Sequence, residues 1–118
     1  MKAYAYFQRS NGECEFVAKV DISEWMDTNE ALEYVYHSLQ NIRGSWSFGP
    51  HFEGSDDDRE GQSNLDYSKE VEFFGEYLQD NEGRKYGERS MMIGDLITFN
   101  GKTYEVDFVG FKEYVEAA

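Results

Sequence analysis

The chain has few residues of the types that carry out enzymatic chemistry. Its ordinary bases near neutral pH are His37 and His51, and its only thiol is Cys14. A hydrolytic site needs a nucleophile, a base and a group that orients the base. None of the three residues lies in a motif typical of such a site, and no glycine-rich phosphate loop joins a strand to a helix. The sequence therefore predicts a protein that is not an enzyme and needs no cofactor.

One acidic run has the spacing of a metal-binding loop. Asp56, Asp58, Glu60 and Gly61 repeat the first half of a calcium loop, in which alternate carboxylates and a glycine surround the ion. The position that completes such a loop with a bidentate glutamate is Tyr67. We therefore assign no metal site, and Asp56, Asp58 and Glu60 stay weak candidates for calcium.

Acidic residues far outnumber basic ones. The 118 residues include 24 Asp and Glu against 11 Lys and Arg, which gives a net charge of -13. This charge repels phosphate, so we expect no direct binding to nucleic acid or to an anionic membrane. We expect the partner to be a host protein with a basic surface, on which the carboxylates take the place of nucleic-acid phosphates.

Two further features indicate where the protein works. A single cysteine rules out an internal disulfide and is typical of a reducing compartment. No apolar run approaches the roughly 20 residues of a membrane span, and no signal-peptide core follows Met1. We expect a cytoplasmic location in a bacterial host.

The acids expected to bind the partner come from the outer side of a predicted helix, a long loop and a predicted strand. They are Glu30, Glu33, Glu53, Asp56, Asp57, Asp58, Glu60, Glu70 and Glu72. Trp46, Phe48 and Phe52 are expected to hold the first half of the loop to the domain, and they would anchor the partner if they were exposed. The hypothesis requires the carboxylates to gather on one face.

The first elements that position these residues are a hairpin and a helix. A hairpin is predicted in residues 1–20, since the Asn-Gly pair at 11–12 accepts the positive φ of a two-residue turn. Asp27 and Glu30 have the spacing of a capping box, which predicts a helix over residues 28–42 that Gly44 ends. Its apolar side comprises Leu32, Val35, Tyr36, Leu39 and Ile42.

The rest of the chain is predicted to be a loop followed by strands. Residues 44–64 form an acidic and aromatic loop, and residues 69–118 form strands that include a C-terminal hairpin with an Asn-Gly turn at 100–101. The whole of 1–118 is one domain, well below the ~250 residues at which a core divides. The predicted fold class is α+β: a curved antiparallel sheet of about five strands, or a partly open barrel, with one amphipathic helix packed on it.

The last third of the chain carries a recognisable pattern. Its members are Arg89, Ser90, Gly94, Asp95, Gly101, Tyr104, Gly110 and Phe111. The pattern resembles the C-terminal module of small proteins encoded by phages, plasmids and conjugative elements, with Met92 where that module has a second serine. The resemblance implies a mobile-element origin and no particular activity. From the residues themselves, we expect Arg89 to pair with a carboxylate and Gly110 to allow close backbone approach at a bulge.

These observations favour a phage or mobile-element protein that binds a basic site on a host protein. A nucleic-acid-handling or defence protein is the expected target, because acidic inhibitors of restriction and CRISPR systems are similar in size and charge. One alternative is a calcium-responsive or general interaction module. A second alternative is a small-ligand-binding protein or a small enzyme, and the oligomeric state stays open.

Overall fold

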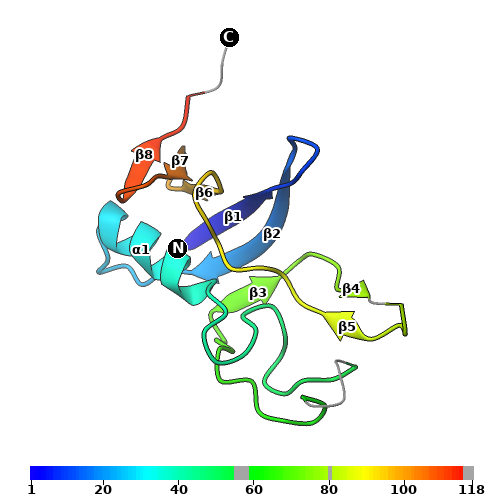
Figure 1. Cartoon of the computed structure of the whole chain (residues 1–118). Coiled ribbons are helices and arrows are strands. Elements are labelled where there is room, and N and C mark those ends of the chain that lie inside the picture. The colour runs from blue at the N-terminus through cyan, green and yellow to red at the C-terminus, as the bar shows by residue number, and fades with distance from the viewer. Residues whose placement is uncertain (55–58, 80, 116–118) are drawn as a thin grey trace.

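The computed structural model describes residues 1–54, 59–79 and 81–115, which form one helix and two antiparallel sheets. The main sheet has six strands in the order β3-β2-β1-β6-β7-β8. They are β1 (Lys2–Gln8), β2 (Cys14–Asp21), β3 (Val71–Phe73), β6 (Leu96–Phe99), β7 (Lys102–Val106) and β8 (Phe111–Glu113). A separate ribbon pairs β4 (Leu78–Gln79) with β5 (Lys85–Tyr86). The predicted α+β fold with a curved sheet is confirmed, and the sheet is open at both edges instead of closing into a barrel (Figure 1).

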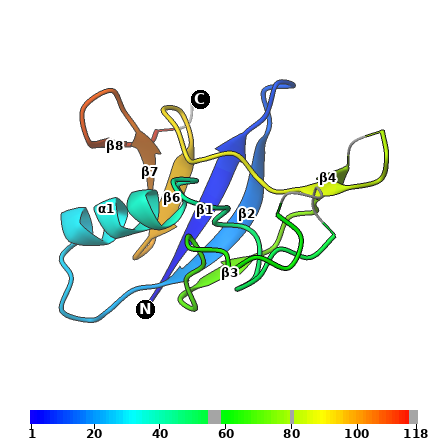
Figure 2. The same cartoon turned by 60° about the horizontal axis from the view of Figure 1, so that its bottom comes forward.

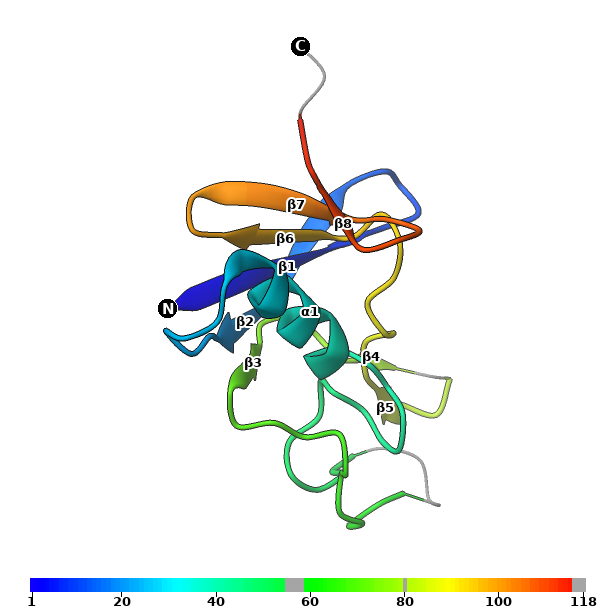
Figure 3. The ribbon, with the colours of Figure 1, turned by 90° about the vertical axis from the view of Figure 1, so that its left-hand side faces the viewer.

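Helix α1 (Thr28–Ser38) lies across one face of the sheet, in front of β1 and β6 (Figure 3). Its buried residues Ala31, Leu32 and Val35 pack against small side chains of the sheet such as Ala3 and Ala5. Small residues beneath the helix let its backbone approach the sheet closely. No helix among the described residues is long and apolar enough to cross a membrane.

The predicted start of α1 is confirmed, and its predicted end is wrong. The Asp27 carboxylate accepts a hydrogen bond from the Glu30 N–H at 2.8 Å, and the Glu30 side chain accepts one from the Asp27 N–H, so the capping box is confirmed. The helix stops at Ser38, four residues before the predicted end. The Met91 N–H donates to the carbonyl of Leu39, and the Gln40 side chain donates to the carbonyls of Tyr36 and Met91. The loop before β6 thus closes the helix end.

The residues after α1 turn around a carboxylate. The Asp66 Oδ2 atom accepts the N–H groups of Ile42, Arg43 and Gly44 at 2.6, 2.9 and 2.8 Å. Ile42 is consequently 75% exposed, and its predicted place on the apolar side of the helix is wrong. Gly44 does not end the helix in a left-handed conformation; it is needed because a Cβ there would collide with the Asn64 side chain.

Both predicted hairpins are present. In β6–β7 the turn residues Asn100 and Gly101 have φ values of 56° and 81°, as a two-residue turn with two positive φ angles requires. In β1–β2, Gln8 pairs with Cys14, so residues 9–13 form a wider turn than the predicted two-residue one. The Asn-Gly signal therefore located both turns but not the length of the first.

Strand β8 returns from β7 through a tight turn. The Asp107 N–H donates to the Gly110 carbonyl at 2.9 Å, and Gly110 has a φ of 69°. A Cβ on Gly110 would meet nothing within 4 Å, so its predicted role in close backbone approach is wrong. This glycine is required by its positive φ.

A buried carboxylate ties the turn before β6 to the end of β1. Asp95 is fully buried, and its two oxygens accept hydrogen bonds from Arg89 Nη1 and Nη2 at 2.7 and 2.8 Å. They also accept the N–H groups of Gln8 and Met92 at 2.9 and 2.8 Å. The Arg89 guanidinium lies 4.5 Å from the centre of the Phe7 ring. The expected pairing of Arg89 with a carboxylate is confirmed.

Removing this carboxylate should destabilise the fold strongly. We expect Asp95→Ala to lower the free energy of unfolding by about 3–5 kcal/mol, because it leaves Arg89 and two backbone donors without their acceptor. The control Glu105→Ala breaks the surface pair with Lys112 at 3.4 Å and should cost about 0–1 kcal/mol. Urea unfolding followed by circular dichroism measures both, and equal losses would contradict the assignment.

Candidate functional site

The acids predicted to bind a partner do not lie on one face. Glu30 and Glu33 are exposed on α1. Glu72 stands opposite Lys19 in the β2–β3 pair and faces away from α1, because its neighbour Phe73 packs against the core beneath the helix. The expected single acidic face is therefore wrong for Glu72.

The other predicted acids have varied surroundings. Glu70 is half-buried, lies 4.0 Å from Lys69 Nζ and accepts a hydrogen bond from Ser68 Oγ. Glu53 and Glu60 are exposed in the loop. The residues Asp56, Asp57 and Asp58, and with them most of the calcium-like run, lie outside the described residues. In the part of the chain that is described, no group of three His, Cys, Asp or Glu side chains is placed to hold a metal ion.

The three aromatic residues of the loop are buried. Trp46, Phe48 and Phe52 are 2%, 6% and 3% exposed. The Trp46 ring lies 5.7 Å from Phe7 and 5.5 Å from Phe73, centre to centre. These residues hold the loop to the domain as predicted. The condition under which they would anchor a partner, exposure to solvent, is not met.

The remaining residues of the C-terminal pattern shape the chain around the sheet. Ser90 Oγ accepts the Asn41 N–H at 2.8 Å, and Gly94 turns the chain into β6 with a φ of 96°. Tyr104 and Phe111 are partly buried against the core. Arg89, Asp95, Gly101 and Gly110 have the roles described above. Most of the pattern thus maintains the fold, and only Gly110 and Phe111 border a hollow of the surface that combines charge with exposed apolar groups.

That hollow lies between α1 and the turn that joins β7 to β8, and we call it the β8 groove. It has a volume of about 280 Å³. Its lining residues are Glu33, Tyr36, His37, Ile93, Val106, Asp107, Phe108, Gly110 and Phe111. The Tyr36 ring meets the Phe111 ring edge to face at 6.4 Å, and this contact joins the helix to β8. The groove is therefore built from three separate segments that the fold brings together.

Exposed apolar side chains border the β8 groove. Phe108 and Val109 are 86% and 82% exposed at the β7–β8 turn, and Met92 and Ile93 are more than half exposed on the neighbouring turn. Hydrogen bonds from Gly94 and Val106 join these two turns. An exposed apolar cluster of this kind is a feature of interaction sites.

The charge beside this cluster is negative. Glu33 and Asp107 line the groove, and Glu30 lies one turn earlier on α1. None of these three carboxylates forms an ion pair with a Lys or Arg of the described chain. His37 and Tyr36 also line the groove. The groove therefore offers apolar contact and unneutralised carboxylates on the same surface.

The predicted bases and thiol are not assembled into a catalytic group. His37 lines the β8 groove. His51 is exposed in the loop, where its backbone forms an isolated antiparallel β-bridge with Ser63. Cys14 is exposed at the start of β2. No serine, threonine or cysteine is among the described residues that line the β8 groove.

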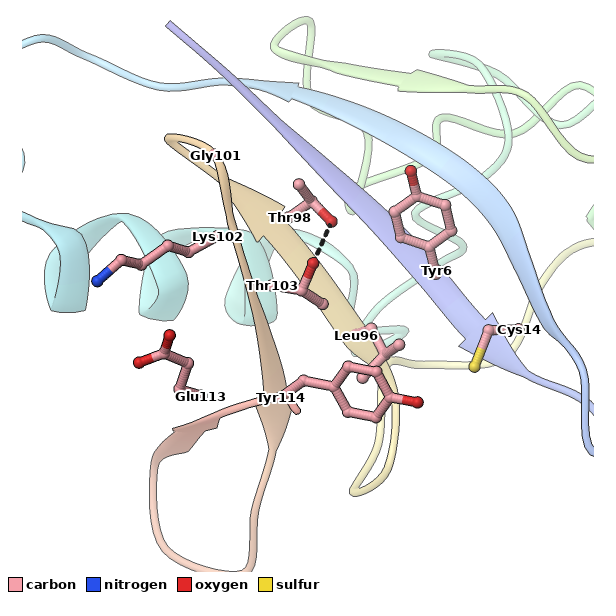
Figure 4. Close-up of a pocket in the computed structure, with 9 residues that line it drawn as sticks. All are labelled: Tyr6, Cys14, Leu96, Thr98, Gly101, Lys102, Thr103, Glu113 and Tyr114. Carbon is pink, nitrogen blue, oxygen red and sulfur yellow. Dashed lines mark hydrogen bonds between the residues drawn. The ribbon is translucent and has the colours of Figure 1, made fainter. Parts of the chain in front are cut away.

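A second hollow, of about 460 Å³, lies on the face of the sheet that α1 does not cover (Figure 4). Tyr6, Leu96 and Tyr114 border it, and Thr98 and Thr103 share a hydrogen bond of 3.2 Å across it. On this face the strand positions directly opposite one another include Lys2–Asp21, Lys19–Glu72 and Glu105–Lys112. At these positions each carboxylate has a basic residue opposite it in the sheet.

No protein-family model matches the chain, and no curated protein or solved structure matches it significantly. The resemblance to phage and plasmid proteins therefore stays a prediction.

Sequence reasoning found Glu33, Gly110 and Phe111 of the groove and missed Ile93, Asp107 and Phe108. The missed signal was Phe108 and Val109, two large apolar residues directly before the glycine of a two-strand turn. The prediction of strands over residues 69–118 covers both positions, whereas the structure places them in a turn. In the turn both side chains point to solvent.

The buried loop aromatics generate a prediction about alkaline stability. Tyr77 stacks on Phe48 at 4.7 Å and donates its hydroxyl hydrogen to the Ser47 carbonyl at 2.9 Å. Burial raises the pKa of Tyr77 above its ordinary value of 10.0. Because the folded state favours the neutral phenol, this stabilisation is complete below pH 10.0 and is lost as the pH rises through the raised pKa.

We therefore expect wild type to lose stability relative to Tyr77→Phe as the pH rises. Urea unfolding of both proteins at about pH 8 and about pH 11 gives the two free energies of unfolding. At the lower pH, the free energy of unfolding of the wild type should include the full contribution of the hydroxyl hydrogen bond. At the higher pH, the difference in free energy of unfolding between wild type and Tyr77→Phe should shrink or change sign. A difference that does not change with pH would show that Tyr77 is not buried in solution.

Proposed function

We propose that this protein is a non-enzymatic binding protein whose β8 groove holds a basic segment of a partner protein. The observation that carries this proposal is the position of Glu33 and Asp107 beside the highly exposed Phe108. A partner segment that carries a basic side chain next to an apolar one is complementary to both the carboxylates and the apolar side chains of this surface. A cation gains contact with the carboxylates, and apolar area is removed from water.

The net charge of -13 supports a basic partner. A field of this sign draws a cationic surface towards the molecule and repels an anionic one. Charges that act at a distance speed the encounter more than they strengthen the complex, so the affinity must come from the groove itself.

The partner that we propose is a host nucleic-acid-handling or defence protein, because such proteins expose basic surfaces that bind phosphates. The geometry supports a narrower form of this proposal than mimicry of a whole duplex. Glu72 lies on the opposite face from Glu30 and Glu33, so a partner at the β8 groove meets only the acids on the α1 side.

A defined peptide tests the groove without knowledge of the natural partner. The probe is a fluorescent peptide of about eight residues with the repeat Val-Thr-Lys-Thr, which places valine and lysine on one side when it is extended. We expect it to bind the protein, and we expect a peptide with glutamate in place of lysine not to bind. Binding should weaken steeply as salt rises, because the groove is open to solvent. Unchanged affinity at about 1 M salt would contradict a role for the carboxylates.

Matched variants locate the binding. Glu33→Lys should weaken binding of the lysine peptide at least about fivefold, whereas Glu13→Lys, with the same change of charge on the β1–β2 turn, should have a much smaller effect. Phe108→Ser should also weaken binding, and Leu65→Ser, which removes another exposed apolar side chain, should not. Fluorescence anisotropy gives the four dissociation constants. Equal effects of Glu33→Lys and Glu13→Lys would show that only the net charge matters.

A further inference from the structure

The two edges of the six-stranded sheet are not equivalent. At the β3 edge, the Val71 N–H donates to the Ser68 carbonyl at 3.1 Å, and the Phe73 ring packs against Trp46 and Tyr77 at 5.5 and 5.4 Å. At the other edge, no strand of the described chain pairs with the outer side of β8. Figure 2 shows β7 and β8 on the opposite side of the molecule from β4. The β8 edge is therefore open.

The hydrogen bonds on either side of β8 fix which backbone groups face outwards. The Tyr114 N–H donates to the Thr103 carbonyl at 2.9 Å, and the Asp107 N–H donates to the Gly110 carbonyl at 2.9 Å. In an antiparallel pair, alternate residues direct their backbone groups to the neighbouring strand. Gly110, residue 112 and Tyr114 therefore direct theirs to β7.

It follows that Phe111 and Glu113 direct their N–H and C=O groups away from the sheet. Two residues of this orientation provide two donors and two acceptors in the spacing that an extended chain requires. The side chains of Phe111 and Glu113 lie on the same side of β8, since Val106 and Tyr104 are their partners in β7. Phe111 lines the β8 groove, so this is the side of the sheet on which α1 lies, and Glu113 stands at its margin, where it also borders the second hollow.

The surroundings of this edge define the kind of chain that it accepts. Next to Phe111 is the exposed apolar cluster. The Glu113 carboxylate forms no ion pair in the described part of the molecule, and Lys102 lies on the same side of the sheet and lines the same hollow (Figure 4). Figure 4 shows Glu113 projecting at the end of β8. An apolar residue beside Phe111 and a basic residue two positions along, beside Glu113, match this pattern. A second copy of the protein fits poorly, because each copy carries a net charge of -13.

We propose that β8 is a strand-addition site, at which an extended basic and apolar segment of the partner pairs with Phe111 and Glu113 as a seventh strand. This inference rests on the proposed function and specifies the conformation of the bound segment. Pairing of backbone groups supplies affinity that depends little on sequence, while the groove selects the side chains that face α1.

The decisive variants separate the backbone of Glu113 from its charge. Glu113→Pro removes both the outward N–H and the carboxylate, and Glu113→Gln removes the carboxylate alone. Proline is tolerated on an edge strand where its missing N–H would face solvent, so the fold should persist. Thermal unfolding of both variants checks this point.

With the Val-Thr-Lys-Thr peptide, we expect Glu113→Pro to bind about three- to tenfold more weakly than Glu113→Gln, because one more hydrogen bond is lost and the strand edge is blocked. Equal dissociation constants for the two variants would overturn strand addition. If Glu33→Lys and Phe108→Ser still weakened binding in that case, the groove would remain the binding site and the partner segment would lie in it without pairing.

Amide hydrogen exchange in the wild-type protein provides a test that needs no variant. At a saturating concentration of the peptide, the amides of Phe111 and Glu113 should exchange at least about tenfold more slowly, because each becomes hydrogen bonded. The amide of Tyr114, which already donates to Thr103, should change less. Slowing at Tyr114 alone, or no slowing at Phe111 and Glu113, would overturn the proposal. If none of the groove variants weakened peptide binding, the proposed function itself would be overturned.

Discussion

The carboxylate of Asp95 is the constraint on which the arrangement of the C-terminal half depends. It is fully buried, and it holds the Arg89 guanidinium together with backbone donors of Gln8 and Met92. A buried charge is stable only when it is paired and fully hydrogen bonded, so the chain can satisfy Asp95 in few ways. The position of the turn before β6 follows from that requirement.

That turn carries one border of the β8 groove. The Gly94 N–H donates to the Val106 carbonyl, and the Val106 N–H donates to the Asp95 carbonyl, both at 2.9 Å. These backbone hydrogen bonds thereby connect Asp95 to β7 and to the turn that exposes Phe108. Helix α1 supplies the opposite side through the contact of Tyr36 with Phe111. These contacts fix the β7–β8 turn in a position that leaves Phe108 and Val109 exposed to solvent.

Local signals in the sequence were sufficient for the main elements. The capping box at Asp27 gave the helix start, and the Asn-Gly pair at 100–101 gave a hairpin turn whose two positive φ angles few other residue pairs adopt. The alternation around Glu72 gave its outward direction. These features depend on neighbours within a few residues.

Features that depend on distant contacts were not accessible in this way. The helix ends early because the N–H of Met91, in the loop before β6, donates a hydrogen bond to the carbonyl of Leu39. Which face of the sheet Glu72 occupies depends on the side that α1 covers, and the alternation of one strand does not reveal it. The β8 groove joins residues 33–37, 93 and 106–111, and no short pattern contains all three segments.

The central claim is that a basic and apolar segment binds between α1 and β8. The most direct measurement is a titration of isotopically labelled protein with the Val-Thr-Lys-Thr peptide, followed by nitrogen–proton correlation spectra. The account predicts that the largest shift changes fall on residues of α1 and on the β7–β8 turn, and that they saturate with one peptide per protein. Changes that centre instead on the uncovered face of the sheet around Tyr6 and Thr98, or on the residues 44–54, would contradict it.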